Sequence, residues 1–345
     1  MILERSRFWQ IIRAGVFSLL FVFSLLACES NDKAEDERKD VKVLNDKLMP
    51  FADAFNELLE SSSDIEAFLF FSDPHLLGYH SSLSYDEEKL FDSSFKSMRA
   101  IYNYLPFSFC LCGGDWLNNS DTQDSAKGKL LYADEMMNKW FSPYYKMMGN
   151  HDTNYQGVVS ETDSSRGDLP DTFINDVYYS DIGTAYYTIK GKNTLFFILD
   201  SGIDWASQID SYRQEQIEWL VSQLLTNTES HIVIGIHMFY NGKIVMPMSQ
   251  ALMDICNAFN RRDVYESSFV KADFIAAQGV VHFIICGHNH MDFVYDEGDI
   301  PCVGITKFIT DGQPSFDLCL VDYDSGYLNM IRVGSGNDRY IPIAQ

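Results

Sequence analysis

Positive charge is scarce in this chain. Its 345 residues include 26 Lys and Arg against 49 Asp and Glu, which gives a formal net charge of -23. Such an acidic surface repels nucleic acids and anionic membranes, so no nucleic-acid-binding patch is expected. A bound metal cation would still reverse the sign of the field at one site. The composition therefore disfavours binding of polyanions through surface charge and leaves a local cationic centre open.

Cysteine is also sparse, and none of the seven cysteines has the paired spacing of a zinc knuckle. Six of them fall mostly in apolar, strand-like runs, where a thiol packs as a small hydrophobic group. These six are Cys110, Cys112, Cys256, Cys286, Cys302 and Cys319. The pattern allows one disulfide, but no functional role is expected for these thiols.

Apolar runs of membrane length are lacking as well. The apolar segment 14–27 follows three arginines and is short for a bilayer span, so residues 1–27 are predicted to be a signal peptide. Its end, Leu25-Leu26-Ala27-Cys28, resembles the bacterial lipoprotein box. The resemblance implies that Cys28 is lipidated and anchors an exported protein to the cell envelope, in the periplasm or at the cell surface. A plain secretory signal with an incidental cysteine is the alternative.

The rest of the chain divides into a short tether and one large domain. Residues 28–48 are almost entirely charged and polar after Cys28, which suits a solvated tether. Residues 49–345 contain no internal repeat and no further linker. The chain is 46% apolar and 14% aromatic, which is enough for a sizeable core.

Helices and strands alternate in the first half of this domain. We expect helices at about 50–59, 87–102 and 125–140, and strands at 65–73, 107–115 and 144–149. This β-α-β-α-β order favours a layered α/β fold with a largely parallel core. Further on we expect a hairpin within 177–200, helices at about 213–225, 250–260 and 268–277, strands at 231–237 and 281–290, and a final meander over 301–334.

Five of these strands end in side chains that can bind metal. The residues are Asp73 and His75, Asp115, Asn150 with His151 and Asp152, His237, and His288 with His290. Asn150 to Asp152 alone also fits a turn in which Asn and Asp bind their own backbone. Five such ends in one chain are harder to explain as turns or core, because buried carboxylates and imidazoles need partners.

The side-chain types indicate which ions such a site would take. Oxygen and nitrogen donors without thiolate suit Mn²⁺, Fe or Zn²⁺. Two carboxylates, one amide and four imidazoles are too many for one ion. A pair of ions about 3.5 Å apart would instead clamp the attacking and leaving oxygens of an in-line displacement.

The ordered motifs Asp-x-His, Gly-Asp-x-x-Asn, Gly-Asn-His-Asp, His and Gly-His-x-His resemble those of the calcineurin-like metallophosphoesterases. They span residues 73–290. The resemblance implies a four-layer α-β-β-α sandwich of two mixed sheets. It also implies a metal-dependent phosphoric ester hydrolase, in which a hydroxide held by two transition-metal ions attacks phosphorus.

Position by position, the resemblance assigns a role to each polar residue. Asp115 bridges the two metals, and His151 is the general acid for the leaving oxygen. The remaining metal ligands are Asp73, His75 and His290 for the first metal, and Asn150, His237 and His288 for the second. Asp152 is expected to support the site or form a turn rather than take part in catalysis.

This chain departs from two branches of the family at Asn118. In protein phosphatases this position holds a carboxylate that polarises the catalytic histidine, and Asn118 can only orient His151 as an amide. In purple acid phosphatases the same position is a tyrosine that binds Fe³⁺, so no purple colour is expected.

Other polar and aromatic residues have less specific expectations. His80, His231 and His282 are expected to be structural, and Asp200 at most supports the site. Four aromatic residues are placed either along a substrate groove or in the packing: Trp116, Tyr155, Phe239 and Tyr240. The only loose candidates for extra phosphate-binding cations are Lys243, Arg261, Arg262 and Lys307.

The substrate class follows from this shortage of cations. A dianionic monoester usually needs additional positive charge, so a diester is slightly favoured. The substrate is expected to be a phosphorylated small molecule or polymer. The alternative is a surface lipoprotein that kept the fold as a binding module and lost catalysis.

Overall fold

The structure is a computed structural model that describes residues 48–75, 85–118, 122–154, 169–201, 211–239, 247–296 and 299–345. The predicted signal peptide and all of the tether except Leu48 lie outside this part. Within the described residues, no helix has both the length and the apolar character needed to cross a bilayer.

The first sheet combines parallel strands from the start of the chain with antiparallel strands from its end. Its order is β15-β14-β13-β1-β2-β3, and β12 pairs with β13. Strand β1 is parallel to β2 on one side and antiparallel to β13 on the other. The bounds are β1 Ile65–Phe71, β2 Cys110–Cys112, β3 Tyr144–Lys146, β12 Ile309–Thr310, β13 Gln313–Asp322, β14 Tyr327–Gly334 and β15 Arg339–Pro342.

The second sheet has a parallel centre and antiparallel edges, in the order β10-β11-β9-β6-β5-β4. Strands β5, β6, β9 and β11 are parallel, and β4 and β10 close the two edges. The bounds are β4 Tyr187–Lys190, β5 Thr194–Leu199, β6 His231–Ile236, β9 Val280–Cys286, β10 Phe293–Tyr295 and β11 Cys302–Gly304. A separate hairpin joins β7 Val264–Glu266 to β8 Lys271–Asp273.

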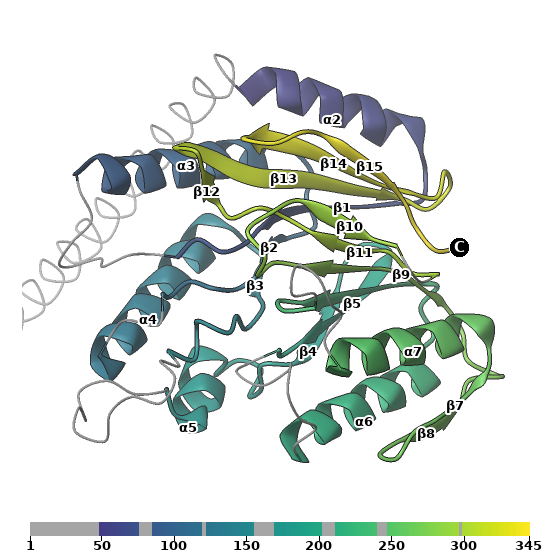
Figure 1. Cartoon of the computed structure of the whole chain (residues 1–345). Coiled ribbons are helices and arrows are strands. Elements are labelled where there is room, and N and C mark those ends of the chain that lie inside the picture. Colours follow the sequence, from purple (N-terminus) through teal and green to yellow (C-terminus); the bar gives the residue numbers. More distant parts are fainter. Residues whose placement is uncertain are drawn as a thin grey trace, which may run out of the picture.

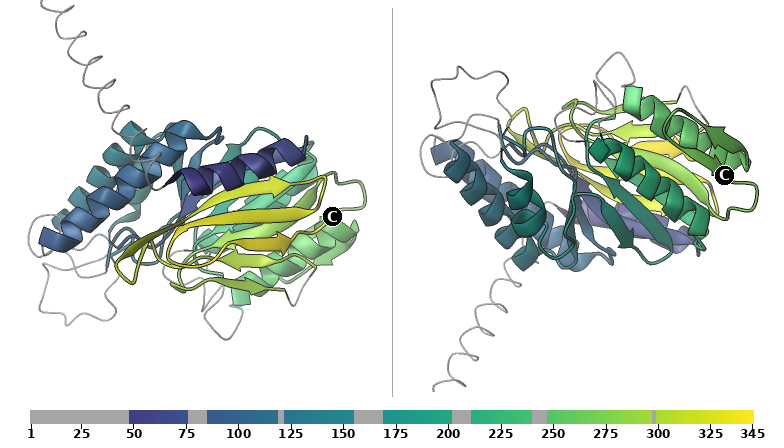
Figure 2. Two further views of the ribbon diagram at one scale, coloured as in Figure 1. Left: turned by 90° about the horizontal axis from the view of Figure 1, so that it is seen from above. Right: turned by 90° about the horizontal axis from the view of Figure 1, so that it is seen from below.

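Helices cover the outer faces of both sheets (Figure 1). Helix α2 crosses the strands that end the chain when the molecule is seen from above, and α6 and α7 cross the second sheet when it is seen from below (Figure 2). The bounds are α2 Met49–Ser61, α3 Tyr85–Tyr104, α4 Gln123–Trp140, α5 Asp171–Phe173 continued by a π-helical turn Ile174–Tyr178, α6 Ser211–Thr226 and α7 Pro247–Arg261.

Strand β5 shows why the sheets pack as inner layers. Phe196 points to the first sheet, where its ring lies 5.3 Å from that of Phe68. The next residue, Phe197, points the other way and packs on Trp219 of α6. Successive side chains of a strand alternate between faces, so a strand buried on both faces is apolar throughout. The predicted four-layer α-β-β-α sandwich is therefore confirmed.

One predicted element is wrong, and the first strand of another starts later than predicted. Residues 268–277 form part of the β7-β8 hairpin rather than a helix, and Ala272 and Phe274 are buried two positions apart, as on a strand. The expected hairpin starts at Tyr187 and not at 177. Before it, Tyr178 and Tyr179 close over the Lys146 ammonium, 3.8 and 5.1 Å from their ring centres. This tertiary contact overrides the strand propensity of the aromatic residues.

The six predicted core cysteines are buried and free. Cys286 and Cys302 lie on neighbouring strands with their Sγ atoms 3.5 Å apart and no bond between them. These residues pack as small apolar groups, as the sequence predicts.

Candidate metal centre

All five predicted strand ends converge on one edge of the sandwich. The loops after β1 and β2 are joined by backbone hydrogen bonds from Asp73 N–H to Gly114 O (3.0 Å) and from His75 N–H to Asp115 O (2.9 Å). In the second sheet, Gly287 N–H donates to His237 O (3.1 Å) and so joins the loops after β6 and β9. The carboxyl ends of parallel strands place loop residues together at such an edge.

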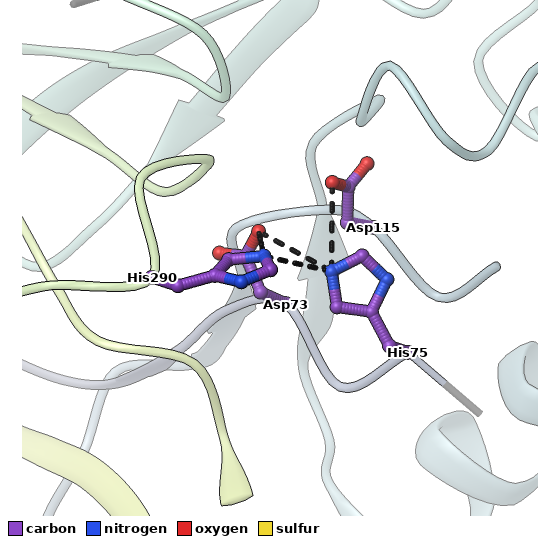
Figure 3. Close-up of side chains that lie close together, drawn as sticks. All are labelled: Asp73, His75, Asp115 and His290. Carbon is purple, nitrogen blue, oxygen red and sulfur yellow. Dashed lines mark hydrogen bonds and ion pairs between the residues drawn. The ribbon is translucent and has the colours of Figure 1, made fainter. Parts of the chain in front are cut away.

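The first cluster of possible ligands contains Asp73, His75, Asp115 and His290, each of which offers an atom within 4.8 Å of the others (Figure 3). The Nε2 atoms of His75 and His290 are 2.8 Å apart. Asp73 Oδ1 lies 3.2 Å from the same atom of His290.

The second cluster shares one residue with the first. It contains Asp115, His237 and His288. Asp115 Oδ2 lies 3.1 Å from His237 Nε2. The Asn150 amide oxygen completes the group, 3.2 Å from His237 Nε2 and 2.9 Å from His288 Nδ1. The structure thus brings all seven predicted ligands together, with Asp115 between the two clusters.

The donor set fits metal cations. Asp73 Oδ1 is buried and accepts no hydrogen bond, which is costly for a carboxylate unless a cation is bound. Backbone carbonyls orient two of the imidazoles: Nδ1 of His75 donates to Leu117 O (2.7 Å) and Nδ1 of His237 to Gly113 O (2.6 Å). Each bond turns Nε2 toward a cluster, as in many metal sites.

Asp115, the residue shared by the two clusters, strongly affects the pKa of a neighbouring histidine. Burial disfavours a charge on His237, but the neighbouring Asp115 carboxylate outweighs it and raises the pKa of His237 to about 10. Burial also opposes ionisation of Asp115, but His237 holds the pKa of Asp115 well below its usual range. By contrast, burial and the nearby His237 lower the pKa of His288 to about 4. Neutral imidazole is the form that binds metal.

Most of the ligands sit on strained backbone. The φ angles are positive at Asp73 (54°), His75 (43°), Asp115 (62°), His288 (70°) and His290 (54°). A residue other than glycine in this region costs of order 1 kcal/mol or more, and such strain concentrates at functional sites. Backbone strain is therefore concentrated at the loops that carry the predicted ligands.

Asp152 explains how the loop after β2 is held. Its buried carboxylate accepts hydrogen bonds from the backbone N–H groups of Asp115 (2.9 Å), Trp116 (2.6 Å), Leu117 (3.2 Å) and Gly149 (3.1 Å). It acts on Asp115 through the backbone, which makes it a positioning residue. Burial and the Asp115 charge raise the pKa of Asp152 to about 7.

Gly149 must be glycine because the Asp115 loop lies against it. A Cβ added there would come within 2.2 Å of both Asp115 N and Asp115 Oδ1. No larger residue fits at this position without moving the residue shared by the two clusters.

A second support, which holds His290, has no signal in the sequence. Thr306 Oγ1 donates to His290 O (3.0 Å), and Thr306 N–H donates to Asp292 Oδ1 (3.1 Å). Asp292 in turn pairs with buried Arg332, whose guanidinium also binds Asp317 through two hydrogen bonds of 2.9 Å. The pattern around Arg332 is that of an ordinary strand, so only its contacts identify its role.

His151 lies beside the clusters without joining them. Its backbone N–H donates to Asp115 Oδ1 (2.8 Å), and its Nε2 lies 3.9 Å from Asp115 Oδ2. His151 Nδ1 is buried and has no partner among the described residues. Asn118 lines the same cavity, but the described structure contains no hydrogen bond between Asn118 and His151. The orienting role of Asn118 stays a prediction.

The remaining aromatic, cationic and histidine candidates lie in different parts of the chain. Trp116 and Phe239 are fully buried, so they belong to the packing and not to a substrate groove. Arg261 pairs with Asp299, and Arg262 binds the backbone carbonyls of Phe259 and Gly279. Lys307 lines the cavity beside the first cluster. His80, Tyr155, Tyr240 and Lys243 lie outside the described residues.

Comparison with known structures supports the fold through one solved protein. A dimetal phosphatase from Danio rerio is similar with a TM-score of 0.50 and 12% identity, over 80% of this chain and 98% of that one. Two others are less similar. The anchor GAP50 of the Plasmodium inner membrane complex has a TM-score of 0.47 and 13% identity, over 82% and 89%. TT1561 of Thermus thermophilus has a TM-score of 0.41 and 9% identity, over 79% and 99%.

Sequence comparisons give one match. No curated protein matches the chain. The family model for the calcineurin-like phosphoesterase domain matches residues 67–292, which include every predicted ligand. This chain belongs to the calcineurin-like phosphoesterase family.

Proposed function

We propose that the protein is a phosphoesterase that depends on two metal ions and prefers diesters. The observation that carries this proposal is the pair of ligand clusters that share Asp115. Mn²⁺, Fe or Zn²⁺ would suit these oxygen and nitrogen donors. When bound, the two ions supply Lewis-acid activation of the phosphoryl group and of the attacking water.

The protein's own residues would hold the ions, orient the ligands and supply a proton. Asp73, His75 and His290 would hold one ion, and Asn150, His237 and His288 the other, with Asp115 between them. His151 would give a proton to the leaving oxygen, which its part-exposed position in the cavity next to Asp115 supports. Leu117 O and Gly113 O keep two imidazoles in the tautomer that binds metal.

The preference for diesters rests on charge. Among the described residues that line the cavity, only Lys307 carries a permanent positive charge. A monoester dianion usually needs more cationic partners than one lysine. A diester with a single negative charge needs fewer.

The test compares bis-p-nitrophenyl phosphate with p-nitrophenyl phosphate as substrates of the purified protein, after chelation and after Mn²⁺, Zn²⁺ or Fe²⁺ is restored. Asp115→Asn should abolish metal-restored turnover because it removes a shared ligand charge. Asp53→Asn, on the exposed face of α2, is the matched control and should leave turnover unchanged. His151→Ala should lower the rate by about 10²-fold or more.

The relative rates with the two substrates and the two variants decide between the alternatives. Faster hydrolysis of the diester supports the preference, and faster hydrolysis of the monoester reverses it. If the protein binds two metals tightly but hydrolyses neither compound, the proposed enzymatic function is wrong. The alternative, a binding protein that kept only the fold, is then supported. Turnover in Asp115→Asn equal to that of Asp53→Asn would remove the shared-ligand mechanism.

We also propose that the protein is exported and anchored through a lipid on Cys28, which the lipoprotein-like junction before that residue supports. Cys28→Ser should release the protein from membranes, measured by its partition between detergent and aqueous phases. Equal partition of both forms would refute the anchor.

A further inference from the structure

A cavity of about 350 Å³ adjoins the first cluster and has two chemically different walls. The polar wall carries the ligands Asp73, His75 and His290, with His151 and Asn118. The apolar wall is formed by other lining residues. It consists of Leu90 and Phe91 from α3 and Ile309 from β12.

The aromatic part of this wall is fixed in place. The Phe91 ring is stacked on Phe95 of the same helix at 6.4 Å and lies 6.3 Å from Phe308. Phe308 in turn lies 4.5 Å from Phe95, so three rings support one another. Phe91 is only partly buried and still faces the cavity. A held, half-buried ring beside a polar centre is a typical wall for an apolar ligand group.

Lys307 adds one charge to the cavity. Its side chain is exposed, and no described residue forms an ion pair or a side-chain hydrogen bond with its ammonium group. In a chain with a net charge of -23, a lysine without such a partner among the described residues and next to possible metal ligands is a local exception. Its charge attracts any phosphoryl anion that enters the cavity.

We propose that this cavity takes the organic group of the substrate and selects phosphoesters whose organic group is an aromatic ring or a flat apolar body of similar size. The proposal rests on the proposed function, because it places the phosphoryl group at the clusters. The ring lies against Leu90, Phe91 and Ile309, and Lys307 contributes to the binding of the anion. A short alkyl or strongly hydrated group does not displace the water that covers the apolar wall, so it gains little binding free energy.

Two phosphonates separate the apolar contact from the charge contact. Phenylphosphonate and methylphosphonate carry the same anionic group and differ in the ring. Their binding to the Mn²⁺-loaded protein is measured by titration calorimetry, which needs no turnover. We expect phenylphosphonate to bind about tenfold more tightly, as expected for partial burial of a ring.

Variants then assign that preference to residues. Phe91→Ala should reduce the phenyl-to-methyl ratio to about two while methylphosphonate binds as before. Lys307→Met should weaken both ligands by the same factor and leave the ratio intact. Tyr104→Ala is the matched control, because Tyr104 is an exposed aromatic residue at the far end of the same helix. It should change neither affinity.

The possible results test this inference separately from the proposed phosphoesterase function. Equal affinity of both phosphonates for the unmodified protein, or an unchanged ratio in Phe91→Ala, overturns the ring-binding wall and leaves the phosphoesterase intact. Absence of binding by either phosphonate, with metals bound, overturns the ring-binding wall. If bis-p-nitrophenyl phosphate is also not hydrolysed by the same metal-loaded protein, the proposed function is overturned as well. Loss of both affinities in Phe91→Ala also counts against the wall, because it shows that Phe91 supports the centre itself.

Discussion

Two pairs of histidines lie at opposite ends of the same two strands. At the start of β6 and within β9, His231 and His282 contact each other through Nδ1 and Nε2, 2.9 Å apart. At the carboxyl ends of these strands, His237 and His288 face Asn150 and Asp115. One residue type thus serves two purposes on one sheet, and the surroundings decide which.

The first pair has enough partners within the protein. His231 Nε2 lies 3.1 Å from Asp64 Oδ2, and His282 Nδ1 donates to Ala344 O (2.5 Å). The ring of His231 is also stacked on Tyr323 at 3.6 Å. The second pair sits near a carboxylate oxygen of Asp73 that accepts no hydrogen bond, and one of its two residues, His288, has a positive φ. The comparison teaches that unmet hydrogen-bonding capacity, not histidine itself, marks the metal centre.

Glycines near each pair give the largest expected effect. Gly149→Ala places a Cβ 2.2 Å from Asp115 N and should lower metal affinity and metal-restored turnover by about 10²-fold or more, since a shift of about 1 Å has such effects. Gly279→Ala, at φ +89° and 2.3 Å from Glu229 O near the first pair, should lower stability and leave metal affinity unchanged.

Metal titration of both variants checks this contrast. Normal affinity in Gly149→Ala would show that the loop yields without moving Asp115. Lost affinity in Gly279→Ala would show that the two ends of the sheet are coupled.

The first pair should respond to pH. Burial and the adjacent His231 lower the pKa of His282 to about 4, from an ordinary value of 6.5. Between pH 6.5 and 4 the unfolded chain therefore binds a proton that the folded chain does not, so stability falls as the pH falls. The difference of about 2.5 units corresponds to at most about 3 kcal/mol.

Urea unfolding of the chelated protein at pH 7.5 and 4.5 measures this loss. His282→Gln should lose less stability than the unmodified protein over the same interval, because its carboxylates still titrate and this imidazole does not. Equal losses in the two proteins would remove His282 as a source of acid sensitivity.

Metal stabilisation should also separate the two pairs. At a metal concentration 100 times the Kd, the free energy of unfolding should rise by about 2.7 kcal/mol. His237→Asn should abolish the part of this rise that comes from the second cluster, and His231→Asn should retain the whole rise. Thermal unfolding with and without Mn²⁺ provides the comparison, and an equal response in both variants would contradict the distinction drawn between the two pairs.

The sequence predicted the layered fold, and it singled out the seven side chains that the structure brings together, because both follow from strand ends. An apolar strand followed by Asp, Asn or His is visible in one dimension, and parallel order brings such ends together. The left-handed backbone at Asp115 or His288 could not be predicted, because no local signal requires it at a residue other than glycine.

Residues that support the site through partners far away in the sequence were harder to predict. Asp152 was expected to support the site or to form a turn, and its bonds to three consecutive N–H groups of the Asp115 loop became evident only in the structure. Arg332 acts across 40 residues through Asp292, a separation that local pattern does not encode. The wrong helix at 268–277 came from a short apolar run, for which helix and strand periods are hard to separate.

The pairing of β1 has a consequence for how the protein is made. Strand β1, which ends just before Asp73, is bordered by β13, and its Leu69 lies opposite Leu318. Contacts of such sequence separation form late, after most of the chain is available. A nascent chain that has just exposed Asp73 and His75 lacks this neighbour. The loop that carries Asp73 and His75 is therefore expected to reach its final position only after β13 has been synthesised and has paired with β1.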